Sequence, residues 1–230
     1  MKEKTVCIIQ ARMASERLPG KMLLKINGIP IIEWVFRRII KCKMIDQVVF
    51  AIPESSKDDV LEEYLINLKA EVYRGDEFDL VGRFYEAAKL WEAKVVVRVC
   101  ADNPFVDAIE IDKAIRFYHL NQFDYVYNHI PKDNNYADGL GAEVISMNTL
   151  GLINKKSTKG SQREHVMNYI WDNPKLFRVS TFNPEDSAIA FPSLRLDIDT
   201  IEDFEKFKNL EIKPDSLSKD IIKLIINKSK

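Results

Sequence analysis

A basic loop follows the first apolar segment of the chain. Four basic residues and one acid lie between residues 11 and 25, so this stretch carries a local charge of plus three. The β-branched, apolar segment 5–10 predicts a buried strand, and polyphosphates bind to loops that follow parallel strands. Arginine and lysine neutralise phosphate oxygens at such places. We therefore expect Arg12, Arg17 and Lys21 to contact phosphates, with a solvated basic surface loop as the alternative.

Acidic side chains follow two other apolar segments. Asp102 stands just past residues 94–100, the strongest strand pattern in the sequence, while Asp197 and Asp199 follow the short apolar segment 194–196. Carboxylates of this kind are the hard oxygen ligands that Mg²⁺ takes, in small numbers, beside phosphate oxygens. Asp199 has a second possible role as a helix N-cap, because a glutamate follows it three residues later.

These side chains require a scaffold that brings strand ends together. The first half of the chain alternates strand and helix patterns, and its strands are apolar on both faces, which is typical of a parallel sheet covered by helices on either side. We predict an α/β fold, a Rossmann-like three-layer αβα sandwich with a mostly parallel sheet. The predicted strands are 5–10, 47–52, 71–73 and 94–100, and the predicted helices are 30–41, 56–68, 78–92 and 112–121.

The second half predicts a small α+β subregion inserted beside that sheet. Residues 216–227 place apolar side chains on one face, which indicates either a docked terminal helix or a dimer contact. The predicted strands here are 142–146, 177–182 and 193–197, and the predicted helices are 147–154, 163–171 and 201–208.

Composition excludes several classes of protein. The 34 Lys and Arg residues against 35 Asp and Glu leave a net charge of −1, so no global field favours nucleic acid or an anionic membrane. No apolar run approaches the ~20 residues that span a bilayer, and no secretory signal is visible. Three widely spaced cysteines, Cys7, Cys42 and Cys100, are expected to be reduced and buried, in a cytoplasmic protein.

Six ordered blocks resemble the nucleotidyltransferases that make CMP-activated acidic sugars, and in particular the spore-coat polysaccharide cytidylyltransferases. The first is IIQARMASERLPGK at residues 8–21, and the third is RVCADNP at residues 98–104. The others lie at residues 74–84, 138–144, 163–166 and 195–204. The resemblance covers nearly the whole chain, so it implies the nucleotide-diphospho-sugar transferase type of fold.

The resemblance also implies roles for individual residues. It implies one nucleotidyltransferase domain, 1–230, with a nucleotide-binding half (1–128), an acceptor-binding half (129–210) and a terminal helix (211–230). The catalytic residues would be Arg12, Lys21 and Asp102, and magnesium would be held by Asp102 with Asp199 or Asp197. Nucleotide contacts are expected from Gln10, Ala11, Arg12, Met13, Ser15, Arg17, Lys21, Arg74, Gly75, Asp76, Arg83, Ala101 and Asp102, and acceptor contacts from Asp138, Glu143, Arg163, Glu164 and His165.

Ordinary structural roles compete with several of these assignments. Arg83 has the alternative of a helix surface charge, and Asp76 that of a turn or cap residue. The turn-forming segment around Asp138 has the alternative of a simple connection, and His165 that of a structural histidine. Gly141-Ala142 stands where many relatives carry Asp-Val, so the resemblance leaves the acceptor open.

The implied reaction is attack by an acceptor oxygen on the α-phosphorus of CTP, with pyrophosphate leaving. Positioning and charge neutralisation carry such a reaction, so no covalent nucleophile is required. The expected acceptor is a polar or acidic small molecule, such as a sugar, a sugar acid or a phosphorylated compound, used for surface polysaccharide or capsule synthesis. Two alternatives are transfer from GTP or UTP to a sugar 1-phosphate and a non-catalytic nucleotide-sugar binding protein. A homodimer is a further expectation.

Overall fold

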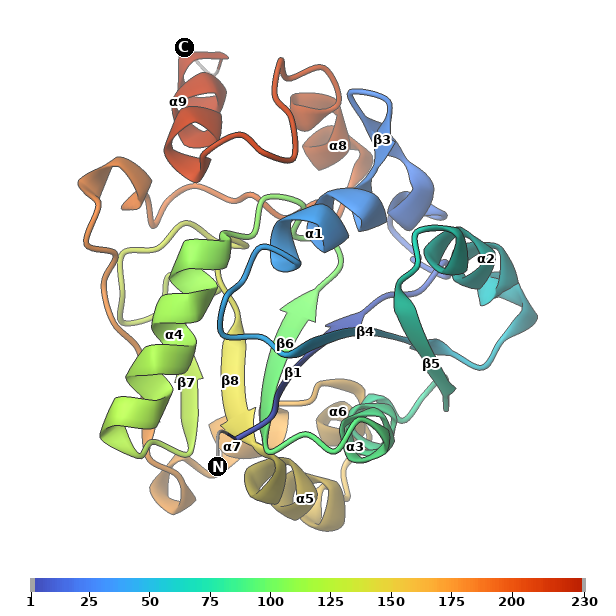
Figure 1. Ribbon diagram of the computed structural model, residues 1–230, viewed down its shortest axis with the longest axis vertical. Helices are drawn as coiled ribbons and strands as arrows, with labels where there is room; N and C mark the ends of the chain where they lie inside the picture. The colour runs from blue at the N-terminus through green and yellow to red at the C-terminus, as the bar shows by residue number, and fades with distance from the viewer. Residues whose placement is uncertain (1–2, 229–230) are drawn as a thin grey trace.

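β-Branched runs build one central sheet in the computed structural model, which describes residues 3–228 (Figure 1). Seven strands are arranged in the order β5 (Glu71–Gly75), β4 (Gln47–Pro53), β1 (Thr5–Gln10), β6 (Val95–Cys100), β8 (Glu143–Ser146), β7 (Tyr125–Tyr127) and β9 (Val179–Ser180). Within this sheet only β8 runs against its neighbours β6 and β7, while the other pairs are parallel. The predicted mostly parallel α/β fold is confirmed.

Helices cover both faces of the sheet, because alternate side chains of each strand point to opposite faces. Cys7 and Ile9 of β1 pack with α1 (Ile31–Ile39), α2 (Asp59–Asn67) and α4 (Ala108–Asn121). Val6 and Ile8 face the opposite layer. That layer consists of α3 (Leu80–Leu90), α5 (Met147–Lys156), α6 (Gly160–Glu164) and α7 (Asn168–Asp172).

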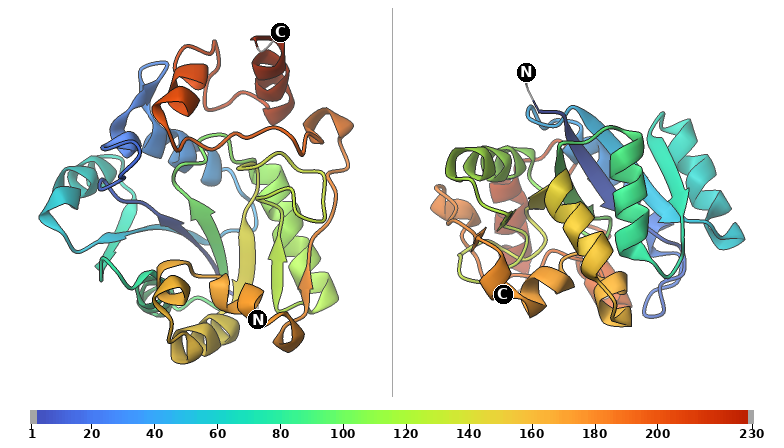
Figure 2. Two further views of the ribbon diagram at one scale, coloured as in Figure 1. Left: turned by 180° about the vertical axis from the view of Figure 1, so that it is seen from behind. Right: turned by 90° about the horizontal axis from the view of Figure 1, so that it is seen from below.

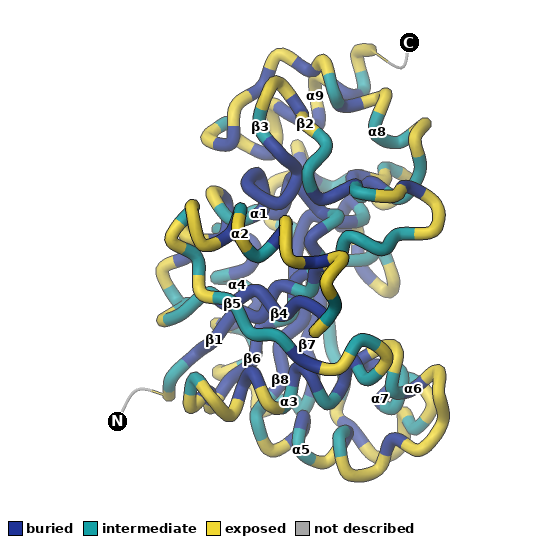
Figure 3. Tube along the Cα trace, turned by 90° about the vertical axis from the view of Figure 1, so that its right-hand side faces the viewer, coloured by how far each residue is buried: buried dark blue, intermediate teal, exposed yellow. Residues whose placement is uncertain are grey.

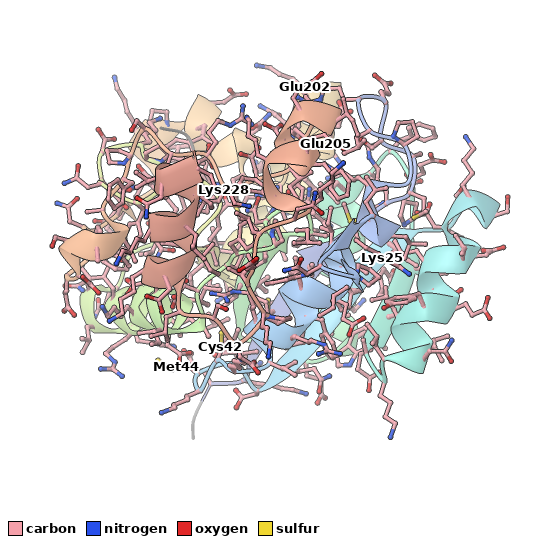
Figure 4. All side chains as sticks on the ribbon, turned by 90° about the horizontal axis from the view of Figure 1, so that it is seen from above. Lys25, Cys42, Met44, Glu202, Glu205 and Lys228 are labelled. Atoms are coloured by element: carbon pink, nitrogen blue, oxygen red, sulfur yellow. The ribbon has the colours of Figure 1, made fainter. Side chains whose placement is uncertain are left out.

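A third apolar cluster lies beyond the carboxyl ends of the central strands. Figure 1 shows α8, α9 and β3 gathered there, and Figure 3 shows the strands buried beneath exposed outer turns. Figure 4 looks onto this end, with Glu202 and Glu205 on α8 and Lys25 on the hairpin. The elements at this end are β2 (Lys25–Ile26), β3 (Ile29–Pro30), α8 (Ile201–Phe207) and α9 (Ser218–Lys228), with short 3₁₀ turns at Lys21–Leu23 and Ser187–Ile189. Two further 3₁₀ turns lie elsewhere, at Ser56–Asp58 before α2 and at Pro174–Leu176 after α7.

The second half of the chain differs from expectation in its connections. Its strands do not form a subregion beside the sheet, because β8 pairs directly with β6, as the view from behind shows (Figure 2). The helix predicted at 163–171 is interrupted, since His165 adopts an extended conformation between α6 and α7. The strand predicted at 193–197 is reduced to a single bridge between Asp138 and Arg195. In the first half, the helix predicted at 112–121 begins earlier, at Ala108, because Asp107 caps it.

Candidate active site

A cavity of about 610 Å³ opens at the carboxyl ends of β1 and β6. Its walls are the loop after β1, the residues after β6, residues 77–83 and residues 160–165, and Asp199 reaches it from the segment before α8. Ligand sites of open α/β sheets lie at this end of the strands, and this volume is within the usual range for a small-molecule site. The predicted phosphate loop therefore shares one cavity with Asp102 and Asp199, two of the three predicted metal-binding carboxylates.

The basic loop is held in a fixed shape. The buried carboxylate of Asp58 accepts a hydrogen bond from the Met13 backbone N–H at 2.6 Å. The Met13 carbonyl accepts hydrogen bonds from the Ser15 and Gly20 N–H groups. Gly20 has a φ of 71°, a left-handed conformation that favours glycine, and it turns the chain so that Lys21 points inward. Asp58, which orders the loop through its hydrogen bond to Met13, was not identified from the sequence.

Lys21 lies at the centre of the site. Its Nζ donates to Asp102 Oδ2 at 2.9 Å, to Asp199 Oδ1 at 3.1 Å and to the Ile198 carbonyl at 3.1 Å. Burial alone would lower the pKa of Lys21, but the two carboxylates more than offset that effect and raise it. The ammonium group is therefore charged and joins two carboxylates that are distant in sequence.

Asp199 faces the cavity and does not cap a helix. Thr200 is the N-cap of α8, and its side chain and that of Asp203 form a capping box. The second oxygen of Asp199 instead lies 2.9 Å from Arg17 Nη2. Asp197 does not line the cavity, because its carboxylate pairs with the exposed Arg195. Asp199 is thus better placed than Asp197 to act together with Asp102.

Arg12 and Arg83 line the same cavity. Neither forms an ion pair with a carboxylate within residues 3–228. Arg83 is only 5% exposed, so its alternative as a helix surface charge is wrong. Burial, followed by the positive charge of Arg12, lowers the pKa of Arg83 to about 10. Arg83 Nε is buried with no hydrogen-bond partner in the described chain, while Nη1 donates to the Asp76 carbonyl. Two neighbouring guanidinium groups of this kind favour an anion between them.

Several predicted contacts do not lie on the cavity. Arg74 forms surface ion pairs with Asp59 and Glu62. The Asp76 carboxylate accepts hydrogen bonds from N–H groups of its own loop, which is the alternative role of a turn or cap residue. Gly75 is buried and packs against the side chains of Tyr73 and Arg83.

Three predicted acceptor contacts are also placed elsewhere. Glu143 is only 2% exposed and is paired with Arg98 beneath the cavity floor, so a direct acceptor contact is wrong for this structure. Arg163 is engaged by Asp79. Asp138 lies beside Asp197, and burial together with that negative charge raises its pKa to about 6.

The rest of the cavity lining combines predicted and unpredicted residues. Glu164 and His165, which the resemblance implies as acceptor contacts, both line the cavity. Glu77 and Phe78 were missed, although they lie within the 74–84 block, and the Phe78 side chain is 82% exposed. Cys100 also lines the floor and was assigned only as a buried thiol. Acidic, neutral and aromatic side chains thus line the cavity together with the basic loop.

The sequence matches the cytidylyltransferase family profile over residues 6–227. The chain belongs to the cytidylyltransferase family. It is therefore an enzyme of the nucleotidyltransferase type, as the resemblance predicts. This cytidylyltransferase is 36% identical over 222 residues to an uncharacterized protein of Methanocaldococcus jannaschii, covering 96% of this chain and 89% of that protein. It is 33% identical over 227 residues to the spore coat polysaccharide biosynthesis protein SpsF of Bacillus subtilis, covering 95% and 92%.

Solved structures share the fold of this cytidylyltransferase. A cytidylyltransferase from Leptospira borgpetersenii serovar Hardjo-bovis superposes with a TM-score of 0.89 at 28% identity, covering 99% of this chain and 96% of that one. CMP:2-keto-3-deoxy-manno-octonic acid synthetase complexed with CTP gives 0.69 at 17% identity, covering 89% and 97%. A Mycobacterium tuberculosis protein complexed with manganese gives 0.64 at 14% identity, covering 90% and 98%. The last two similarities show the fold alone.

Proposed function

We propose that this enzyme transfers CMP from CTP to a polar or acidic small molecule and releases pyrophosphate. The observation that carries the proposal is the opposition of Arg12, Arg17 and Lys21 to Asp102 and Asp199 in one cavity. Cations suited to a triphosphate and carboxylates suited to its counter-ion are the two parts that such a reaction requires. Membership of the cytidylyltransferase family supports CTP as the nucleotide.

Mg²⁺ fits the donor set of this site. Asp102 and Asp199 supply hard carboxylate oxygens that both lie within hydrogen-bonding distance of one ammonium group. No cluster of three or more potential metal-binding side chains occurs in residues 3–228. One or two carboxylates with substrate phosphates are the usual protein share of a magnesium site. When bound there, the ion would supply charge neutralisation to the phosphate oxygens.

The residues of this chain provide the remaining chemistry. Arg12 and Arg17 bind phosphate oxygens, and Lys21 exchanges its carboxylate partners for the phosphate group that gains charge during transfer. The walls of the cavity hold the acceptor oxygen in line with the α-phosphorus, and this orientation replaces covalent catalysis. Pyrophosphate leaves from the basic loop.

We propose a sugar, a sugar acid or a phosphorylated compound as the acceptor, in surface polysaccharide or capsule synthesis. The spore coat polysaccharide role of the Bacillus relative and the sugar acid that the octonic acid synthetase activates support this class. In this proposal the nucleotide occupies the half formed by residues 1–128, and the acceptor contacts residues 129–210 through Glu164 and His165.

Pyrophosphate release tests the proposal directly. The protein would be incubated with CTP, Mg²⁺ and a panel of sugar acids and sugar phosphates. We expect turnover that Asp102→Asn reduces at least about a hundredfold, because a carboxylate that would hold Mg²⁺ beside the reacting phosphates loses its charge. The exposed Asp133→Asn is the matched control and should retain activity. Absence of turnover with CTP, GTP, UTP and ATP would contradict the proposal.

The proposal also covers the cellular location, the partners and the oligomeric state of the enzyme. No helix within residues 3–228 is both long and apolar enough to cross a membrane. We propose a cytoplasmic enzyme that acts on small molecules without nucleic acid, since CTP is a cytoplasmic substrate. Light scattering would test the expected homodimer, for which the partly exposed Leu217 and Leu224 near and on α9 are available.

A further inference from the structure

The amide of Gln10 has a fixed direction at the cavity floor. Gln10 ends β1 and lines the cavity, and its Oε1 accepts a hydrogen bond from Arg98 Nε at 2.9 Å. A guanidinium group only donates, so the amide oxygen must face Arg98 and the amide nitrogen must point away. Among residues 3–228, Gln10 Nε2 has no hydrogen-bond acceptor. It does not belong to the buried polar atoms that lack a partner in this part of the chain, so the amide nitrogen is accessible. Two N–H donors are therefore presented to the cavity.

Arg98 is itself held by a buried network. It lies directly across the β6–β8 ladder from Glu143, and the two side chains form an ion pair with exposed fractions of 11% and 3%. Glu143 also accepts a hydrogen bond from the Tyr125 hydroxyl, and His129 Nε2 lies 3.7 Å from it. Burial opposes ionisation of Glu143, but the Arg98 charge lowers its pKa overall. Buried charges that are paired in this way keep a single arrangement.

We propose that Arg98, with Glu143, is a positioning residue that directs the Gln10 amide toward an oxygen atom of the acceptor substrate. This inference rests on the proposed function, and it reassigns Gln10, which the resemblance implies as a nucleotide contact, to the acceptor. Gln10 pairs in register with Cys100 on the cavity floor, and its supporting network leads to β8 and β7 in the second half of the chain. The triphosphate cations instead lie on the loop between residues 12 and 21. The ligand group is a carboxylate, carbonyl or hydroxyl oxygen.

Steady-state kinetics of Gln10→Glu tests the direction of the amide. The glutamate keeps one oxygen for Arg98 but presents its second oxygen, in place of the N–H donors, to the acceptor. With 3-deoxy-manno-octulosonate, or any panel acceptor that turns over, KM for the acceptor should rise about tenfold or more. KM for CTP should change less than about twofold. An unchanged acceptor KM, or a rise in the CTP KM instead, overturns the proposal.

A matched control separates this effect from a general cost of new charge. Gln47→Glu makes the same substitution at the opposite end of the neighbouring strand β4, away from the cavity. It should leave both KM values unchanged, and Gln10→Glu should unfold at the same temperature as the unmodified enzyme. If both variants raise the acceptor KM equally, the effect comes from charge and the proposal is wrong.

A second measurement does not depend on finding the acceptor. ¹⁵N relaxation of the Gln10 side-chain amide, assigned by its absence in Gln10→Glu, should give an order parameter near ~0.8 in the free enzyme. The double variant Arg98→Met/Glu143→Leu removes the pair without leaving a buried charge, and the order parameter should then fall below ~0.6. A mobile amide in the unmodified enzyme contradicts the positioning role, whereas absence of any turnover contradicts the proposed function.

Discussion

Lys21 is the residue through which three distant parts of the chain meet. Its ammonium group contacts Asp102 and Asp199, and its own position depends on the turn at Gly20. We predict that Lys21→Met lowers kcat/KM at least about a hundredfold, because a cation aimed at developing phosphate charge is removed. Pyrophosphate release measures this change. The exposed Lys25→Met is the control, and equal losses in both variants would show that Lys21 has no special role.

Asp138 should make stability depend on pH. Burial and the charge of Asp197 raise its pKa to about 6, above the ordinary value of 3.8. The unfolded chain therefore releases this proton first, and the carboxylate lowers stability as pH rises from about 4 to 6, with no further change above that window. We predict that Asp138→Asn raises the melting temperature at pH 8 by roughly 2 to 4 °C, which corresponds to about 1 kcal/mol in the free energy of unfolding.

Melting temperatures measured at a second pH identify the cause of that gain in stability. At pH 4 the Asp138→Asn variant and the unmodified enzyme should melt at nearly the same temperature, because the carboxyl group is then largely protonated in the folded state. Asp133→Asn, on an exposed loop, should show no such dependence. A gain of equal size at both pH values would assign the effect to packing and not to ionisation.

The roles of single residues could be predicted from the sequence only where they do not depend on a partner that is distant in the chain. Arg12, Lys21, Asp102 and Asp199 were found from charge type and from their places after strands, since these features are local in sequence. The partnership of Arg98 with Glu143 was not predicted, because it depends on an antiparallel pairing between β6 and β8 that no local pattern specifies. The sequence thus identified the cavity-facing charges better than the buried pairs that support them.

At the scale of single elements, the start of α8 controls the placement of Asp199. Thr200 caps the helix, and Asp203 completes the capping box by accepting the Thr200 N–H. We predict that Thr200→Ala lowers the free energy of unfolding by about 1 kcal/mol, measured by urea denaturation. Thr200→Ser keeps the hydroxyl and should retain most of that stability. If serine were as destabilising as alanine, the lost methyl group would be the cause.

The turn before β8 leaves no room for a larger residue at position 141. A Cβ atom on Gly141 would collide with the side chain and carbonyl of Asn128, whose Oδ1 accepts the Ala142 N–H at 2.9 Å. We predict that Gly141→Ala destabilises the enzyme by about 1 to 3 kcal/mol. Gly151→Ala, in α5 where contacts are ordinary, is the control and should be neutral or slightly stabilising in urea denaturation.

Elements were predicted well where one apolar pattern was long and ended at clear signals. Strand 5–10 matches β1, and strand 94–100 matches β6 to within one residue. The hairpin β2–β3 was missed, although its Asn27-Gly28 turn is a known hairpin signal, because each strand has only two residues. The extended conformation of His165, which divides the helix predicted at 163–171, has no local sequence signal.

At the scale of the whole molecule, ligand binding should report on the completed site. We predict that CTP with Mg²⁺ binds only to the folded state, so at about a hundredfold excess over Kd it should add about 2.7 kcal/mol of stability. In a chain of this size that corresponds to a rise in melting temperature of roughly 5 to 10 °C. Thermal-shift measurements with CTP, UTP, GTP and ATP would check it, and a larger shift with another nucleotide would contradict cytidine specificity.

The overall charge balance hides the site. Nearly equal numbers of cations and anions leave a net charge of −1, yet Arg17 and Lys21 face Asp102 and Asp199 within one cavity. Whole-chain arithmetic therefore predicted the absence of a nucleic-acid or membrane field but could not predict the location of the charges. That location depends on the fold, which brings together residues from both halves of the sequence.

The sheet order has a consequence for synthesis on the ribosome. Strand β6 is complete when Cys100 has emerged, but its neighbour β8 begins only at Glu143, and β7 reaches the sheet only through β8. Until then the nascent chain displays an apolar strand with one unpaired edge, a state that invites association with other chains. Translation pauses between these two strands should therefore favour aggregation or chaperone binding more than pauses after β8 has emerged.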